Sequence, residues 1–181
     1  FCIEAVLLDL KNPLKVIART PRPLLVPEES YEKYGKAPNI VFPSGALIKG
    51  KKLFVYYGAA DTVCAVAVGE LEPIMREMLG TKAEMIRMMR SARNPIIAPD
   101  PAVSWKKKAV FNPAALLADG KIHILYRAMS QDNTSTLGYA VSQDGFVITE
   151  LSSDPAYAPR EDFEKKLVPG GNSGCEDPRL T

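Results

Sequence analysis

Short apolar runs separated by turn residues dominate the chain. Residues 53–57 and 122–126 are rich in β-branched and aromatic side chains, and 15 prolines and 12 glycines punctuate the sequence around such runs. Runs of this length and composition, bounded by turn residues, are typical of β-strands. The pattern therefore predicts that most of the chain is β-structure.

Residues 70–93 follow a different pattern. Their leucine, isoleucine and methionine side chains recur at helical spacing, with charged residues between them. This periodicity predicts helix, and Gly80-Thr81 is expected to divide it into two helices. We interpret the methionines as a packing face and not as contacts to a cofactor.

An internal repeat relates the two sides of this helical segment. The matching pairs are 22–27 with 94–99, 42–47 with 111–116, and 49–57 with 118–126. A small-residue strand follows each copy, at 63–69 and at 137–142. A unit of several antiparallel strands used twice is typical of propeller blades. Two blades cannot close a ring, so either the chain is part of a longer ring or its exposed faces favour association with other copies.

Composition excludes several classes of function. The 181 residues contain 23 basic and 21 acidic side chains, a net charge of +2 that gives no nucleic-acid footprint. No apolar run approaches the roughly 20 residues of a membrane-spanning helix. Cys2, Cys64 and Cys175 are far apart and odd in number, which argues against disulfides or a zinc site and favours the cytoplasm.

Residues that break the repeat are the candidates for chemistry. Asp177 lies in the sequence Gly-Cys-Glu-Asp-Pro-Arg, between a glycine-rich approach and a proline, where an acid could be held rigidly. The alternative is an Asp-Pro turn with a surface ion pair.

Arg127 ends an apolar strand where the other copy has Gly58, and its donors suit sugar hydroxyls or carboxylates. The alternative is a solvated arginine at a strand end.

Two further polar residues occupy similar positions. Asn112 stands opposite Pro43 in the repeat and could bind a sugar or cap a turn. Asp61 follows an apolar strand among small residues, where a ligand could approach or an Asx turn could form. His123, the only histidine, aligns with Phe54 and is interpreted as structural.

These residues resemble a known family. Residues 94–97, 110–115, 125–128, 137–145 and 174–181 resemble the opening third of glycoside hydrolase family 130, the β-1,4-mannoside phosphorylases that act on mannosylglucose or mannooligosaccharides. Residues 41–46 and 55–62 resemble the closing section of the same family. The family's order is thus inverted, and either a junction between fused copies or a circular permutation would explain it.

The resemblance implies an all-β fold, an incomplete part of a five-bladed β-propeller with a helical connector. Its divisions are a last-blade-like region at 1–69, a helical connector at 70–92, and a first-blade-like region with the start of the next blade at 93–181. The implied enzyme is a glycosyltransferase-type phosphorylase that cleaves β-mannosides by inverting phosphorolysis and releases mannose 1-phosphate. The resemblance implies no metal and no cofactor, inorganic phosphate as co-substrate, a β-mannosyl oligosaccharide as substrate, and a homo-oligomer.

The resemblance also assigns roles to the candidate residues. Asp177 would be the general acid, acting through a mannose hydroxyl, and Arg179 would contact the substrate beside it. Asn112 and Arg127 would bind the mannosyl unit, and Asp61 would reach the substrate from the last blade. Asp61 and Asp177 share one pocket or belong to two different active sites. A β-mannosidase of the same family and a non-catalytic sugar-binding or structural fragment are the alternative functions.

Overall fold

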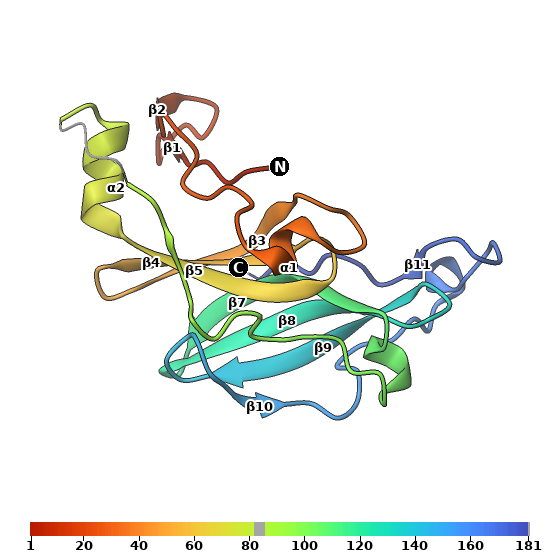
Figure 1. Cartoon of the computed structure of the whole chain (residues 1–181). Coiled ribbons are helices and arrows are strands. Elements are labelled where there is room, and N and C mark those ends of the chain that lie inside the picture. The colour runs from red at the N-terminus through yellow and green to blue at the C-terminus, as the bar shows by residue number, and fades with distance from the viewer. Residues whose placement is uncertain (82–85, 181) are drawn as a thin grey trace.

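The structure, a computed structural model that describes residues 1–81 and 86–180, is built around two sheets, called blade 1 and blade 2, each with four consecutive antiparallel strands (Figure 1). Blade 1 has the strand order β3-β4-β5-β6, with β3 at Val41–Lys49, β4 at Lys52–Ala59, β5 at Val63–Glu70 and β6 at Met89–Arg90. Blade 2 has the order β7-β8-β9-β10, with β7 at Ala109–Ala118, β8 at Lys121–Met129, β9 at Thr134–Ser142 and β10 at Ile148–Leu151. The prediction of a mainly β-structure is confirmed.

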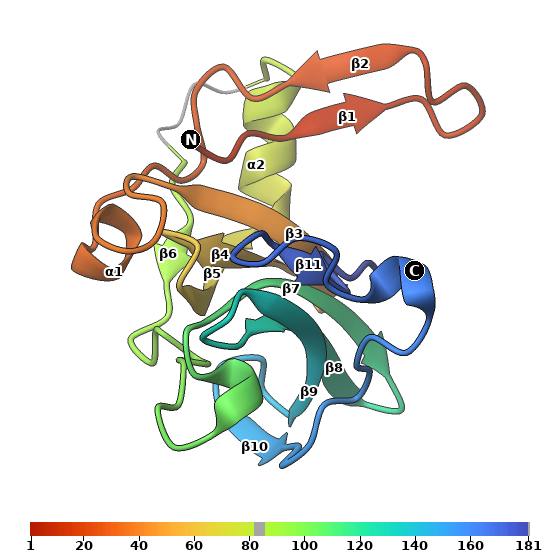
Figure 2. The same cartoon turned by 90° about the vertical axis from the view of Figure 1, so that its right-hand side faces the viewer.

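Smaller elements surround the two blades. They are hairpin strands β1 at Val6–Leu8 and β2 at Val16–Arg19, helices α1 at Ser30–Lys33 and α2 at Leu71–Met78, 3₁₀ turns at Ser104–Lys106 and Asp162–Glu164, and strand β11 at Ser173–Gly174, which pairs with β9. Figure 2 shows the β1–β2 hairpin beside α2, on the side of blade 1 that faces away from blade 2. Within the described ranges, no helix is long and apolar enough to cross a membrane.

The sequence repeat corresponds to the two blades. The first two strands of each blade pair with the same irregularity, which falls between Pro43 and Gly45 in blade 1 and between Phe111 and Ala114 in blade 2. The first strands of the two blades, β3 and β7, lie side by side. They approach so closely that a Cβ atom added at Gly45 would lie 2.6 Å from the Ala115 backbone nitrogen. A bulge repeated at one register position re-aims the side chains of both strands.

Blade 1 is buried on both faces, which explains the continuous apolar run of β4. Phe54 and Tyr56 pack toward blade 2, in a core that also contains Ile122 and Ile124. Val55 and Tyr57 point to the opposite face, where Ile74 of α2 and Met88 cover them. Alternate residues of a strand face opposite sides, so a strand between two packed layers has no polar face.

The helical segment is shorter than the periodicity predicts. Helix α2 is confirmed, and Gly80 follows it with a φ of +70°. The prediction of a second helix is wrong for residues 86–90, because Met88 enters the core and Met89 and Arg90 pair with β5 as β6. Met85 lies outside the described residues. Pairing with a free sheet edge thus overrides helical spacing here, and β6 becomes the fourth strand of blade 1.

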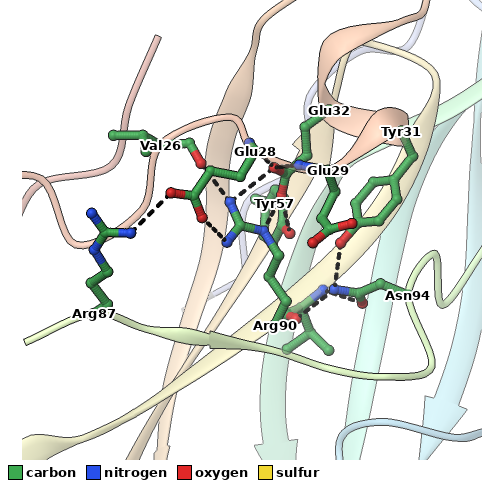
Figure 3. A network of polar contacts seen from close by, with 10 residues as sticks. Val26, Glu28, Glu29, Tyr31, Glu32, Tyr57, Arg87, Arg90 and Asn94 are labelled. Atoms are coloured by element: carbon green, nitrogen blue, oxygen red, sulfur yellow. Dashed lines mark hydrogen bonds and ion pairs between the residues drawn. The ribbon is translucent and has the colours of Figure 1, made fainter.

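A buried ion pair holds this short strand against the rest of blade 1 (Figure 3). The Glu32 carboxylate is fully buried, and the Arg90 guanidinium donates to it through Nε at 2.7 Å and through Nη2 at 2.9 Å. The Tyr57 hydroxyl donates to the same carboxylate at 2.8 Å. Because β6 has only two paired positions, Ala67 with Arg90 and Val68 with Met89, this contact adds to the backbone hydrogen bonds that attach it.

Candidate functional site

Asn112, in β7, and Asp177, in the segment after β11, have similar local backbone geometry. Both have left-handed backbone conformations, with φ of 51° and 47°, and each precedes a proline. In both cases the residue two positions earlier donates its backbone N–H to a carbonyl in, or directly before, the third strand of the preceding blade. Val110 donates to the Thr62 carbonyl, and Cys175 donates to the Ser135 carbonyl. Asp177 therefore begins a third copy of the repeat, at the position where blade 2 has Asn112.

The left-handed backbone is what turns these two side chains toward each other. Asparagine and aspartate tolerate this conformation better than other residues with a side chain. The Asn112 amide Nδ2 donates to Asp177 Oδ1 at 2.8 Å. The side chains at these two positions thus meet at one open cavity.

Four of the five predicted site residues line one open cavity of about 250 Å³. The residues that line it are Phe1, Ile40, Phe42, Asp61, Phe111, Asn112, Arg127 and Asp177. Asp61 and Asp177 therefore share one pocket in this chain. The fifth predicted residue, Arg179, is exposed and lies outside the lining, with its guanidinium donating to the carbonyl of Pro178 at 2.8 Å.

Arg127 is an internal anchor and not a solvated strand end. Only 6% of its surface is exposed. Its Nη1 lies 3.3 Å from Asp177 Oδ1, its Nη2 lies 2.5 Å from Glu176 Oε1, and its Nε donates to Ser135 Oγ at 3.0 Å. The guanidinium also lies over the Phe111 ring, 4.7 Å from its centroid. A guanidinium with this many fixed contacts has a fixed orientation, which suits recognition of a polar ligand.

Asn112 offers a free acceptor inside the site. Its side chain is 6% exposed, and its Oδ1 has no hydrogen-bond donor in the part of the chain that the structure describes. A buried acceptor without a donor costs free energy unless a ligand or water supplies one. The Asn112 amide is thus fixed on Asp177 through Nδ2, and its Oδ1, which packs against Gly58, would have to turn toward the cavity to meet a ligand hydroxyl.

Asp61 lies in the turn between β4 and β5, where both Ala60 and Asp61 have positive φ. Burial raises the pKa of the Asp61 carboxyl, and the nearby charge of Asp177 raises it further. The cations Lys36 and Arg127 offset part of this effect. Asp61 is thus a partly desolvated acid at the wall of the cavity, with Lys36, Arg127 and Asp177 nearby.

Ser135 and Glu176 are site residues that the sequence did not single out. Ser135 is fully buried, and its hydroxyl accepts a hydrogen bond from Arg127. Its backbone carbonyl accepts from the Cys175 N–H and so holds the segment that carries Asp177. Its position in the repeat matches Thr62, so the repeat contained a signal for it. Glu176 lay within the acidic motif but had no predicted partner.

Comparison with known proteins finds a family similarity over part of the chain. The model of glycoside hydrolase family 130, described as β-1,4-mannooligosaccharide phosphorylase, matches residues 1–79. A 1,2-β-oligomannan phosphorylase of Thermoanaerobacter sp. (strain X514) is 53% identical over 72 residues, which are 40% of this chain and 24% of the relative. A β-1,2-mannobiose phosphorylase of Listeria innocua is 38% identical over 78 residues, which are 43% of this chain and 22% of the relative.

The chain thus spans about a quarter of the length of these curated relatives. A solved structure, the sucrose-6-phosphate hydrolase of Lactobacillus gasseri, aligns with a TM-score of 0.52 at 14% identity and covers 74% of this chain and 26% of that one. This likeness concerns the fold alone. It agrees with two blades of an incomplete five-bladed propeller. The similarity to glycoside hydrolase family 130 thus covers residues 1–79, which are less than half of the chain.

Proposed function

We propose that this chain forms part of the active site of a β-mannoside phosphorylase, which cleaves its substrate by inverting phosphorolysis and releases mannose 1-phosphate. The observation that carries the proposal is the convergence of Asp61, Asn112, Arg127 and Asp177 on one cavity. The family match and the names of the relatives support the substrate class. Arg179 remains a proposed substrate contact beside the acid.

The chemistry needs one acid from the protein. A phosphate oxygen attacks C1 of the mannosyl unit, the bond from C1 to the bridging oxygen breaks, and the departing oxygen takes a proton. Phosphate is already an anionic nucleophile, so the base that activates water in an inverting hydrolase is not needed. We assign the proton to Asp177, acting through a mannose hydroxyl.

The geometry favours one oxygen of Asp177 for this proton. Asn112 and Arg127 both contact Oδ1, and no contact to Oδ2 occurs in the described residues. Donors that hold one carboxylate oxygen leave the other available to carry a proton. Oδ2 is therefore the proposed site of the transferred proton, and the contacts to Oδ1 orient it.

The relatives bear on the linkage of the substrate. Those from Thermoanaerobacter and Listeria carry names that specify β-1,2-linked mannosides, whereas the family description specifies β-1,4 linkages. We propose a β-1,2-linked mannoside as the preferred substrate, on the strength of the 53% identity. We further propose that the protein works as a cytoplasmic homo-oligomer with inorganic phosphate as co-substrate and without a cofactor.

Product analysis tests the proposed function. The purified protein is incubated with β-1,2-mannobiose, β-1,4-mannobiose and β-1,4-mannosylglucose, each with and without phosphate, and mannose 1-phosphate and free mannose are assayed. Phosphate-dependent mannose 1-phosphate supports the proposal, and the fastest substrate identifies the linkage. Free mannose formed without phosphate would identify a mannosidase, and no product from any substrate would favour a non-catalytic role.

Gly58 is expected to be required for sugar binding, because it leaves room for Asn112. A Cβ atom at Gly58 would lie 2.6 Å from Asn112 Oδ1 and 3.0 Å from the Asn112 backbone nitrogen. Gly58→Ala should therefore displace the Asn112 amide and weaken sugar binding about tenfold, the effect of about 1.4 kcal/mol in lost hydrogen bonding. Isothermal titration with methyl β-D-mannopyranoside measures this.

The matched control is Gly171→Ala, because a Cβ atom at Gly171 has no neighbour closer than 3.4 Å. This control should bind as the unaltered protein does. Equal affinity in Gly58→Ala would show that Asn112 does not bind the sugar.

A further inference from the structure

Phe42 and Phe111 occupy equivalent positions of blades 1 and 2, but their surroundings differ. The Phe111 ring is 1% exposed, with the Arg127 guanidinium 4.7 Å and the Lys36 ammonium 5.6 Å from its centroid. In the sheet register Phe111 is paired with Arg127. The long side chain on the neighbouring strand therefore covers the ring of its paired residue.

The corresponding pair in blade 1 is Phe42 with Gly58. Gly58 has no side chain to cover a ring, and Phe42 is 37% exposed. In the described part of the chain, no cation or aromatic ring packs on Phe42. The absence of a side chain at Gly58, which makes room for Asn112, thus also leaves the Phe42 ring uncovered.

Phe42 also lines the cavity that contains the polar site residues. Together with Phe1 and Ile40, this exposed ring gives the cavity an apolar side opposite its hydrogen-bonding groups. Sugar sites need both, since a pyranose presents hydroxyls at its edge and C–H groups on a face.

We propose that Phe42 is the platform for the apolar face of a β-mannosyl unit and that it selects the β-anomer over the α-anomer. The inference rests on the proposed function and deepens it. In a β-mannopyranoside the axial hydrogens of C1, C3 and C5 form one apolar face, and the axial O2 lies on the other. An α-mannoside places its axial O1 on the apolar face, so it cannot lie flat on an aromatic ring.

Binding of the two anomers tests this platform without requiring turnover. Methyl β-D-mannopyranoside and methyl α-D-mannopyranoside are titrated by calorimetry into the unaltered protein and into Phe42→Ala, Phe42→Leu and Phe42→Tyr. The unaltered protein should prefer the β-anomer. Phe42→Ala and Phe42→Leu should lower affinity for the β-anomer about tenfold and abolish the preference, whereas Phe42→Tyr, which keeps a flat ring, should retain both.

The control is Phe163→Ala, since Phe163 is 82% exposed and lies outside the cavity. It should leave both affinities unchanged. Phe42→Leu keeps an apolar side chain at this position, so the two affinities can still be measured in that variant if Phe42→Ala does not fold.

Two results would overturn the platform, and they differ in what they say of the proposed function. Unchanged β-anomer affinity and an unchanged anomer ratio in the Phe42→Leu variant would exclude the platform and leave the sugar site in place. No binding of either anomer by the unaltered protein would remove the sugar site itself and the platform with it.

Discussion

Asp177→Asn should lower the rate of mannose 1-phosphate release about a thousandfold, within the range that general acid catalysis contributes. The asparagine side chain has nearly the same shape, and its amide oxygen can still accept from Asn112 and Arg127. It has no proton to transfer to the departing oxygen. Initial rates with β-1,2-mannobiose and phosphate measure the loss, and thermal unfolding should stay close to that of the unaltered protein.

A mannoside with a better leaving group separates an acid from a structural residue at position 177. Dinitrophenolate leaves without protonation, so dinitrophenyl β-mannoside should be cleaved by Asp177→Asn with a much smaller loss than mannobiose. A structural role would lower both rates equally. Asp119→Asn, a change in the exposed turn between β7 and β8, is the control and should keep full activity with both substrates. Mannobiose turnover within a factor of about two would exclude Asp177 as the acid.

The repeat explains why so much of the blades could be predicted. Strands β3, β4, β7 and β8 follow from short apolar runs between turns, and the offset of 69 residues between their copies agrees with their equal registers. The bulge that both blades share is known only from the structure. The second half of the helical segment could not be predicted, because Met89 and Arg90 have helical spacing but meet an open edge of β5. Local periodicity contains no information on a free sheet edge.

The site was predictable where it breaks the repeat. Arg127 replaces Gly58, and Asn112 replaces Pro43, so comparison of the copies pointed to both. Asp177 came from its motif, and the structure adds that it is the next copy of the Asn112 position. The roles of these residues remain predictions. Contacts without a repeat signal, such as Arg127 to Glu176 or Glu32 to Arg90, depend on how segments 49 or 58 residues apart meet in space.

Glu32→Gln should destabilise the protein by about 3 kcal/mol, because it breaks a buried ion pair while leaving the cation in place. The Glu32 side chain is 0% exposed and that of Arg90 14% exposed. Besides Arg90 and Tyr57, the backbone N–H groups of Glu28 and Glu29 donate to this carboxylate (Figure 3). A glutamine places an amide N–H₂ against these donors. Urea unfolding, followed by circular dichroism, measures the change.

The matched control is Glu150→Gln, which removes an exposed ion pair in blade 2. Glu150 lies 3.3 Å from Lys121, and the two side chains are 61% and 46% exposed. Exposed pairs contribute little, so this change should cost less than about 1 kcal/mol. An equally small effect of Glu32→Gln would show that the buried pair does not stabilise the attachment of β6.

The dependence on pH distinguishes loss of this charge from loss of packing. Burial alone would raise the pKa of Glu32, but the hydrogen bonds from Arg90, from the Glu28 and Glu29 N–H groups and from Tyr57 outweigh it and hold the pKa below its ordinary value of 4.5. A carboxylate with a lowered folded pKa stabilises the fold above its unfolded pKa and loses that effect as the pH falls through the folded pKa. The difference in unfolding free energy between the unaltered protein and Glu32→Gln should therefore be constant above about pH 6 and shrink below about pH 4.5. A difference that stays constant down to about pH 3 would assign the effect to packing.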